Sequence, residues 1–341
     1  MDTGQNTSTT QVAANQIHRK IYEQLLKPSA PDKHEYHGHH HMTNTAPALG
    51  FIGLGVMGEP MCRNLVSRSS AIASCVSAYD LNPQPMERLH QAGATTVQSI
   101  EQLASEADIL FLSLPGGDEV ESVLTAPDGV FANAKQGLII VDLSTSEVGL
   151  TRQLAGLAEE QGIRYADAPV ARTREAAISG TLAIMVGADK NLFDTIEPYL
   201  SCMASDILHC GDNGAGQMVK ILNNMVLFQT VLGLSEALTM ARRAGLDGSV
   251  LFDALGKGSA ASFALSNHGI KALLPGNFPE QAFSTRYAKK DLAYALKLAE
   301  STQTQTPGAE TVMEQFDRAI AAGDGDKYWP VLQNVIDSEK H

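Results

Sequence analysis

Short apolar segments alternate with amphipathic segments from Leu49 to Gly211, and this alternation restricts the chain to a small set of folds. Runs such as ILFLSL at 109–114 and LIIVDL at 138–143 lack the strict alternation of polar residues that marks a half-exposed strand. The segments between such runs repeat with the helical period. We therefore predict a doubly wound α/β sheet of buried, mostly parallel strands, with helices on both faces.

The strand pattern stops after DILHCG at 206–211, and from 216 to about 337 every long segment is helix-periodic. We therefore predict an α/β domain at 47–212 that is followed by an all-α domain at 213–338. The expected strands lie at 49–55, 75–80, 95–98, 108–115, 137–145, 164–170 and 181–188, and the expected helices between them at 60–69, 83–93, 100–107, 118–125, 148–162 and 191–203.

Residues 1–46 differ in composition from the rest of the chain. They are polar and hold six of the ten histidines, including HGHHH at 37–41. We interpret them as a disordered leader or tag, with Met42 as the native start. The alternative is a natural histidine-rich metal-binding tract.

Composition excludes several classes of protein. A net charge of −13 without a basic cluster excludes a nucleic-acid partner. The four cysteines form no C-x-x-C pair, so we expect neither a disulfide framework nor a metal site, and a cytoplasmic location. The charge-free stretch at 221–235 is shorter than the roughly 20 apolar residues of a membrane span, so we expect no membrane partner.

A G-x-G-x-x-G motif lies between the first expected strand and helix, where glycines let a backbone approach the pyrophosphate of a dinucleotide. Asp80 follows 22 residues after Gly58, at the end of the second strand, where an acid holds the ribose hydroxyls. Since Asp80 would repel a 2′-phosphate, we predict NAD rather than NADP. A glycine-rich turn without a ligand is the alternative. The predicted cofactor-binding residues are Gly53, Leu54, Gly55, Val56, Met57, Gly58 and Asp80.

A second motif, GDNGAGQMVKILNN at 211–224, lies where the two domains are expected to join. Lys220 and Asn224 are four residues apart, so on a helix they share one face and can both reach a cleft between the domains. A lysine that extends to solvent from the first turn is the alternative. A helix N-terminus disfavours a cation, which counts against a purely structural lysine.

These residues resemble the β-hydroxyacid dehydrogenase family. The resemblance covers 49 to about 335 and rests on GLGVMGEPM at 53–61, DLST at 142–145, GDNGAGQMVKILNN at 211–224 and KDL at 290–292, in the family's order. It implies a Rossmann-type domain followed by an all-helical domain. It also implies Lys220 as the catalytic lysine with Asn224 beside it, Ser144 on the substrate, Leu114, Pro115 and Thr145 along the cofactor, and Lys290 near the nicotinamide side.

The chain departs from the family pattern at two places. Val148 stands where a proline is usual, with little consequence for chemistry. Arg172 and Thr173 stand where the family has glycines that approach the substrate carboxylate. This pair resembles the variant of 3-sulfolactaldehyde reductases, and a guanidinium suits an anion with several oxygens. We therefore predict both residues as substrate-binding; a solvent-facing Arg172 is the alternative.

Together these observations predict an NAD-dependent oxidoreductase that interconverts a small 3-hydroxy acid, carboxylate or sulfonate, and its semialdehyde. Lys220 exchanges the hydroxyl proton, because a lysine amine can take a proton or give one. The apolar helix after Lys220 predicts a homodimer or homotetramer. An imine reductase, or a catalytically silent NAD-binding scaffold, is the alternative.

Overall fold

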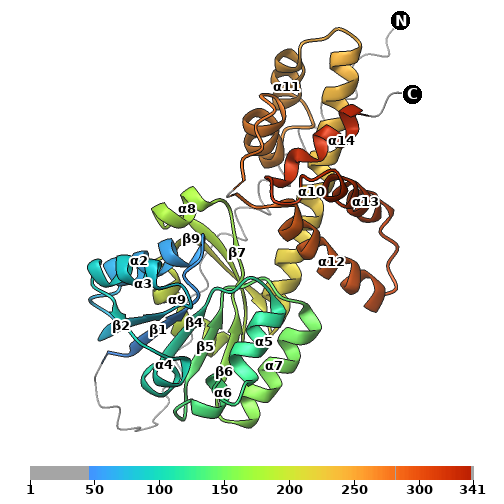
Figure 1. Cartoon of the computed structure of the whole chain (residues 1–341). Coiled ribbons are helices and arrows are strands. Elements are labelled where there is room, and N and C mark those ends of the chain that lie inside the picture. Colours follow the sequence, from blue (N-terminus) through green and yellow to red (C-terminus); the bar gives the residue numbers. More distant parts are fainter. Residues whose placement is uncertain (1–45, 281, 339–341) are drawn as a thin grey trace, which may run out of the picture. The chain divides into compact units, whose positions relative to one another are not determined.

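A computed structural model describes residues 46–280 and 282–338 of the chain, so the expected leader lies outside the described residues except for Ala46. The described strands form one sheet in the order β3-β2-β1-β4-β5-β6-β8-β7, with β9 beside β8 (Figure 1). The strands are β1 (Ala48–Ile52), β2 (Cys75–Tyr79), β3 (Thr95–Thr96), β4 (Ile109–Leu112), β5 (Ile139–Asp142), β6 (Arg164–Asp167), β7 (Val170–Ala171), β8 (Leu182–Gly187) and β9 (Ala204–Gly211).

The first six strands pair in parallel, as the alternating pattern predicts. Their order, 3-2-1-4-5-6, is that of a Rossmann-type sheet. Every residue of β4 and β5 is buried, which explains why their sequences are continuously apolar up to the terminal Asp142. The helices that lie between the nine strands along the chain are α2 (Gly58–Arg68), α3 (Pro83–Gln91), α4 (Ile100–Glu106), α5 (Gly117–Thr125), α6 (Val130–Asn133), α7 (Val148–Glu160), α8 (Arg174–Ser179) and α9 (Lys190–Leu200).

Helices cover both faces of the sheet (Figure 1). Successive strand residues point to opposite faces and pack in two separate apolar clusters. Phe51 of β1 packs in one apolar cluster with Leu65 of α2 and Ile196 of α9. Its neighbour Ile52 packs in the other cluster with Leu103 of α4, and Leu154 of α7 lies in that cluster too. The sheet is therefore buried on both sides, as the sequence predicts.

The last strands differ from the expected parallel arrangement. β8 runs antiparallel to β6 and β7. It is parallel only to β9, to which the helix α9 connects it along the chain. The sequence analysis also missed β7, α6 and α8, which have two, four and six residues. Elements this short do not complete enough of a repeat for the apolar pattern to show.

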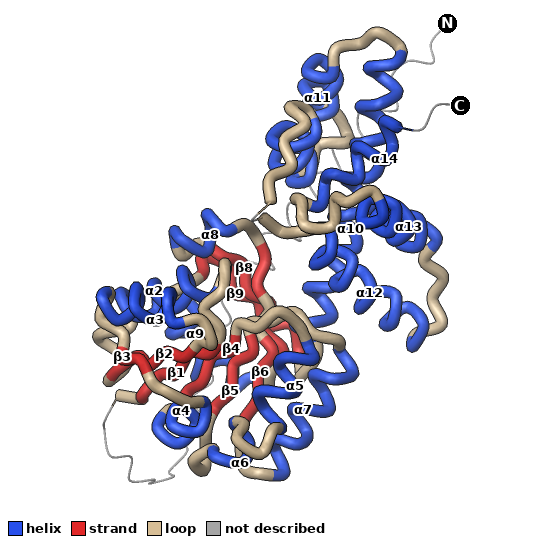
Figure 2. Tube along the Cα trace, viewed as in Figure 1, coloured by secondary structure: helices blue, strands red, loops and turns tan. Residues whose placement is uncertain are grey.

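The described chain after β9 is helical, as expected (Figure 2). A cluster of aromatic rings holds these helices together, with Phe228 4.7 Å from Trp329 and 5.4 Å from Phe316 between ring centroids. The segments are α10 (Ala215–Arg243), α11 (Gly248–Lys257), the π-helical η1 (Leu265–Leu273), α12 (Thr285–Ser301), α13 (Pro307–Ala321), the 3-10 helix η2 (Trp329–Val331) and α14 (Leu332–Ser338).

The longest of these helices, α10, is long and apolar enough to cross a membrane by length and composition alone. It contacts β8, α12, α13 and α14, and Phe228 and Leu238 on it are fully buried. These are the contacts of a core helix. The change from sheet to helices falls between Gly211 and Ala215, whereas residues 45–341 form one compact unit by their contacts, so the division into domains at 212/213 stays a prediction.

A buried carboxylate joins the start of α10 to the end of β6. Asp167 Oδ1 accepts a hydrogen bond from Gly214 N at 2.7 Å, and its Oδ2 accepts one from Gln217 N at 2.8 Å. A Cβ on Gly216 would lie 2.4 Å from the Met185 carbonyl oxygen. This close approach of helix and sheet is the reason for a glycine at 216.

Gly216→Ala is expected to destabilise the protein by about 1–3 kcal/mol, because the added methyl group meets backbone rather than a flexible side chain. Gly233→Ala in the same helix is the control, since a Cβ at Gly233 meets nothing within 4 Å. That change is expected to stabilise by about 0.5–1 kcal/mol. Urea unfolding of the two variants measures both effects, and equal stabilities would contradict the close packing.

Candidate active site

The glycine-rich turn between β1 and α2 shows which of its glycines the chain itself requires. Gly53 has φ +93°, and a Cβ there would lie 2.2 Å from the Ser113 carbonyl oxygen. A Cβ on Gly58 would lie 1.9 Å from the Gly53 carbonyl oxygen. A Cβ on Gly55 meets no atom within 4 Å. The outer two glycines are therefore needed for folding, whereas Gly55 leaves open space beside the backbone for a ligand.

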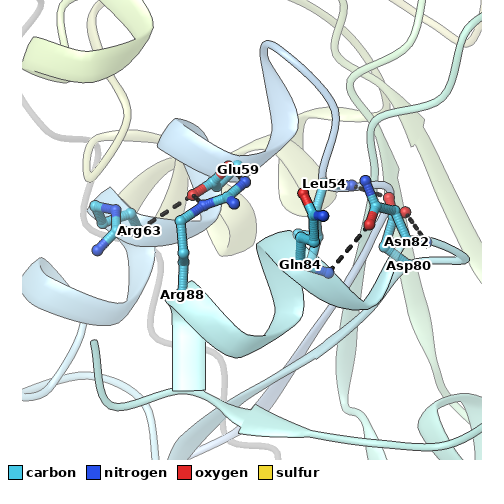
Figure 3. Close-up of polar contacts among 7 residues, drawn as sticks. All are labelled: Leu54, Glu59, Arg63, Asp80, Asn82, Gln84 and Arg88. Atoms are coloured by element: carbon cyan, nitrogen blue, oxygen red, sulfur yellow. Dashed lines mark hydrogen bonds and ion pairs between the residues drawn. The ribbon is translucent and has the colours of Figure 1, made fainter. Parts of the chain in front are cut away.

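Asp80 lies against this turn, just after β2 (Figure 3). Its Oδ2 accepts a hydrogen bond from Leu54 N at 2.5 Å, and its Oδ1 accepts one from Asn82 N at 2.7 Å. Each carboxylate oxygen keeps a second lone pair for a further donor. The Asn82 side chain in turn accepts from Gln84 N at 3.0 Å and caps α3. Asp80 is thus fixed beside the glycine-rich turn, and its contact with ribose hydroxyls stays a prediction.

The turn fits the phosphates of a dinucleotide. α2 begins without a side-chain hydrogen bond at its N-cap residue, Met57, and Gly55 leaves its backbone uncovered. A helix N-terminus of this kind favours an anion. The predicted Leu54, Val56 and Met57 belong to the same turn.

The predicted residues after β4 and β5 meet at the carboxyl edge of the sheet, where ligands bind in α/β folds of this kind. Leu114 N donates to Ser144 Oγ at 2.9 Å, which holds the two loops together, and the exposed Pro115 follows Leu114. Thr145 comes next after Ser144, and its carbonyl oxygen accepts from Lys290 Nζ at 3.3 Å. Lys290 of α12 therefore reaches the loop after β5.

Lys220 lies in a hydrogen-bonded group of four side chains from α10 and α12. Its Nζ donates to Asn224 Oδ1 at 3.3 Å, and Asn224 Nδ2 donates to Asp291 Oδ2 at 2.8 Å. Asp291 is buried, and its Oδ1 lies 3.1 Å from Lys290 Nζ. The predicted Lys220, Asn224 and Lys290 thus lie together, and one carboxylate joins them.

This arrangement biases the protonation of Lys220. Burial of its amine lowers the pKa of Lys220, Asp291 raises that pKa, and the nearby Lys290 lowers it further. The net direction is below the ordinary value of lysine. A lowered pKa brings the neutral amine, which can accept a proton, closer to neutral pH.

Several buried residues of this region were not predicted as functional. Asp291 stands beside Lys290 in the KDL motif, and Asp167 lies within the expected strand at 164–170. Gln217 accepts from Ser146 N at 3.0 Å and donates to the Ser144 carbonyl oxygen at 2.8 Å, which holds the loop after β5 against α10.

Two neighbouring strands end in buried carboxyl groups. Burial raises the pKa of Asp142 to about 6, against hydrogen bonds from Ser144 and Tyr165 that lower it. Burial likewise raises the pKa of Asp167 to about 6. Tyr165 donates to Asp142 Oδ2 at 2.9 Å. Ser144 is therefore held from both sides, as an acceptor from Leu114 and as a donor to Asp142.

Arg172 and Thr173 do not join the Lys220 group through any contact of the described residues. Arg172 donates to the Thr181 carbonyl oxygen at 2.6 Å and pairs with Asp206 Oδ2, also at 2.6 Å. The Thr173 hydroxyl lowers the pKa of Glu175 through a hydrogen bond. Substrate contact by these two residues stays a prediction, and it would require the guanidinium to leave its present partners.

No three His, Cys, Asp or Glu residues within 46–280 and 282–338 form a group that could hold a metal ion. The histidine-rich run at 37–41 lies outside the described residues. The expected absence of a metal stays a prediction.

Comparison with known proteins assigns the chain to a family. Residues 48–211 match the model of the NAD binding domain of 6-phosphogluconate dehydrogenase. Residues 214–329 match the model for the NAD-binding segment of NADP-dependent 3-hydroxyisobutyrate dehydrogenase. The chain belongs to the β-hydroxyacid dehydrogenase family. The resemblance found in the sequence motifs is thereby confirmed.

Individual relatives agree with this assignment. The chain is 36% identical to 2-(hydroxymethyl)glutarate dehydrogenase of Eubacterium barkeri, over 81% of this chain and 90% of that protein. It is 34% identical to 2-hydroxy-3-oxopropionate reductase of Escherichia coli, over 81% and 92%. The structure of Mycobacterium tuberculosis 3-hydroxyisobutyrate dehydrogenase with L-serine aligns at a TM-score of 0.77, with 29% identity, covering 86% of this chain and all of that one.

Family membership confirms the Rossmann-type fold with a helical second part, and it makes this β-hydroxyacid dehydrogenase an oxidoreductase that uses a nicotinamide dinucleotide. The family models name both NAD and NADP, so the choice between the two cofactors depends on this chain's own residues.

Asp291→Asn is expected to move the pH dependence of alcohol oxidation to lower pH. Asp291 raises the pKa of Lys220, so loss of its charge lowers that pKa and leaves the amine neutral at a lower pH. The asparagine retains an oxygen to accept from Asn224. The pH at which kcat for oxidation reaches half its maximum measures the shift.

Asp253→Asn is the control for the change of charge, because Asp253 pairs with Lys257 on the exposed face of α11, 2.6 Å away. Its pH profile is expected to match that of the wild type. If the pH of half-maximal kcat stays in place or moves to higher pH in Asp291→Asn, the assignment of Lys220 as the titrating group is contradicted.

Proposed function

We propose that this enzyme interconverts a small 3-hydroxy acid and its semialdehyde, with Lys220 as the group that exchanges the hydroxyl proton. The proposal rests on the hydrogen-bonded group of four side chains around Lys220. In this group Asn224 links Lys220 to Asp291, and Lys290 reaches the Thr145 carbonyl oxygen. This contact connects the proposed proton-transfer group with the carboxyl edge of the sheet. The relatives' names support the substrate class, since they act on hydroxy acids or an oxo acid.

The bound nicotinamide accepts or supplies the hydride. The chain's own residues must then move one proton at the substrate oxygen. In oxidation the neutral Lys220 amine takes the hydroxyl proton; in reduction the ammonium form returns it. Asn224 accepts from Lys220 and donates to Asp291, so its amide is fixed and orients the amine without competing for the proton.

The acid group of the substrate needs a cation or donors near Lys220. Lys290 is the second lysine of the group, and its Nζ lies 4.9 Å from the centre of the Tyr294 ring. We propose that Lys290 and the loop that carries Ser144 bind the substrate anion. Ser144 is buried and already holds Leu114, so it acts through the position of the loop as well as through any contact of its own.

We propose NAD as the physiological cofactor, because Asp80 is fixed where a 2′-phosphate would meet its negative charge. We also propose a cytoplasmic location. Cys62, Cys75, Cys202 and Cys210 are all free thiols, as in a protein of a reducing compartment.

Lys220→Ala is expected to lower kcat by roughly 10² to 10⁴ while the dinucleotide still binds, because proton transfer is lost and the glycine-rich turn is untouched. Lys220→Arg is not expected to restore activity, since a guanidinium does not give up its proton near neutrality. Turnover of 3-hydroxyisobutyrate, L-serine, 2-(hydroxymethyl)glutarate, 2-hydroxy-3-oxopropionate and a three-carbon sulfonate aldehyde, with NAD(H), measures the activity and the substrate range.

Lys257→Ala, which removes an exposed lysine of α11, is the matched control and is expected to retain the wild-type kcat. Near-normal kcat in Lys220→Ala on the best substrate would transfer the role to another residue. Turnover of none of these compounds by the wild type would contradict the proposed substrate class.

A homodimer, or a multiple of it, is the proposed assembly. Val219, Leu222 and Val226 follow each other at helical spacing on α10 and are 41%, 37% and 59% exposed. An exposed apolar stripe of this kind, on a helix that also carries core residues such as Phe228, favours contact with a second subunit.

Val226→Glu is expected to weaken this assembly, because it places a charge in the contact. Sedimentation equilibrium at micromolar concentration is expected to give at least twice the mass of one chain for the wild type and a lower mass for the variant. Val250→Glu on α11, a residue with a similar exposure of 57%, is the control. A monomeric wild type would contradict the proposal.

A further inference from the structure

A hollow of about 440 Å³ lies beside the glycine-rich turn, and its lining is rich in arginine. Gly55 and Val56 of the turn line it, as does Asn82 of the segment after β2. The charged residues of its lining are Arg63 of α2, Arg88 of α3, Arg174 of α8 and one carboxylate, Glu59 of α2. Three guanidiniums against one carboxylate make this lining positive.

Asp80 indicates that the hollow lies next to the expected site of the cofactor's ribose. The carboxylate binds Leu54 N and Asn82 N, and both of these residues line the hollow. In a Rossmann-type fold the acid after the second strand holds the ribose hydroxyls. A phosphate on the 2′-hydroxyl of that ribose therefore has its nearest cations in this hollow. The arginines come from three helices, and the segment directly after Asp80, residues 81–85, holds none of them.

Glu59 engages two of these arginines (Figure 3). Its Oε1 accepts from Arg88 Nε at 2.8 Å and its Oε2 from Arg88 Nη2 at 2.7 Å, which is the paired geometry of a guanidinium on a carboxylate. Oε1 also accepts from Arg63 Nη2 at 3.3 Å. Arg88 lowers the pKa of Glu59, so the carboxylate stays ionised near neutral pH.

We propose that Glu59 is a specificity-determining residue of this enzyme, which excludes the 2′-phosphate of NADP by holding Arg88 in a two-point ion pair. This inference rests on the proposed function, because it assumes that a dinucleotide binds at the glycine-rich turn with its ribose at Asp80. It adds a second determinant to Asp80. Asp80 repels a 2′-phosphate directly, whereas Glu59 occupies the donors of Arg88, one of the three arginines of the hollow.

The physical argument is a competition between two anions for the same donors. A phosphate and a carboxylate both use the paired N–H groups of a guanidinium, so Arg88 cannot serve both with the same two groups. A phosphate that enters the hollow would also be close to the Glu59 charge and repelled by it. Replacing Glu59 by glutamine removes the charge, keeps nearly the same volume and leaves one acceptor oxygen in place of two, which frees at least one donor of Arg88.

Calorimetric titration of the full-length protein with ADP-ribose and with 2′-phospho-ADP-ribose tests the inference. Both probes lack the nicotinamide, so they report binding at the ribose without turnover. In Glu59→Gln, the affinity for the 2′-phosphorylated probe relative to the unphosphorylated one is expected to rise by about tenfold or more, the size of one charge-assisted hydrogen bond. In the double variant Glu59→Gln/Arg88→Gln that gain is expected to disappear.

Two further variants serve as controls. Glu59→Asp keeps the charge and is expected to keep an affinity ratio near that of the wild type. Asp326→Asn removes a carboxylate from another exposed ion pair, with Arg286 Nε at 3.2 Å, and is expected to leave the ratio unchanged.

An unchanged ratio in Glu59→Gln would overturn the inference, and so would a gain that persists in the double variant. If ADP-ribose still binds in those cases, the cofactor assignment stands and only the role of Glu59 fails. If the wild type binds neither probe, the dinucleotide site at the glycine-rich turn is itself wrong, and this inference fails with it.

Discussion

The hydrogen bonds from Gly214 N and Gln217 N to Asp167 connect the two halves of the structure at the place where chemistry is proposed. Asp167 is the last residue of β6, and both donors lie at the start of α10. Lys220 follows Gln217 by three residues, so the position of its amine depends on where α10 begins. A Cβ on Gly187 would lie 2.5 Å from Asp167 Oδ1, so this glycine makes room for the carboxylate at the end of β8.

The second constraint is the charge balance around Lys220. Two lysines share one buried carboxylate, Asp291, and Asn224 relays its influence to Lys220 through two hydrogen bonds. When Lys220 is protonated, the single anion Asp291 between two cations leaves the group positive, and when Lys220 is neutral the charges of Lys290 and Asp291 balance. Burial and Lys290 together lower the pKa of Lys220 in spite of Asp291. The arrangement therefore favours an amine that both accepts and returns a proton.

The sequence predicted the first six strands as buried and mostly parallel because buried strands are continuously apolar and the glycine motif marks the first turn. Their spatial order was not predicted, because it depends on how the strands pair. The sequence predicted Lys220, Asn224 and Lys290 as functional, and the structure brings them together. It did not predict Asp291 as their link, because that contact depends on how α12 packs against α10. It also missed the arginines beside the glycine-rich turn, because their meeting depends on how α2, α3 and α8 pack.

Arg172 shows a different limit. Its residue type suggested an anion-binding group, but the sequence does not reveal that Asp206 of β9 lies 2.6 Å from its guanidinium. The backbone at Arg172 has φ +85°, a conformation that glycine adopts most easily. Arg172 directly follows β7, whose antiparallel pairing with β8 the short sequence of β7 did not indicate.

Direct titration of the Lys220 amine tests the central claim. NMR spectra of the protein with ¹³C-labelled lysine side chains, recorded across pH, give the pKa of each lysine. The Lys220 resonance is assigned by its absence in Lys220→Arg. A pKa below the ordinary value of 10.5 is predicted from burial of the amine beside Lys290. A pKa at or above 10.5 would contradict the account, because Lys220 would then stay protonated where the enzyme must accept a proton.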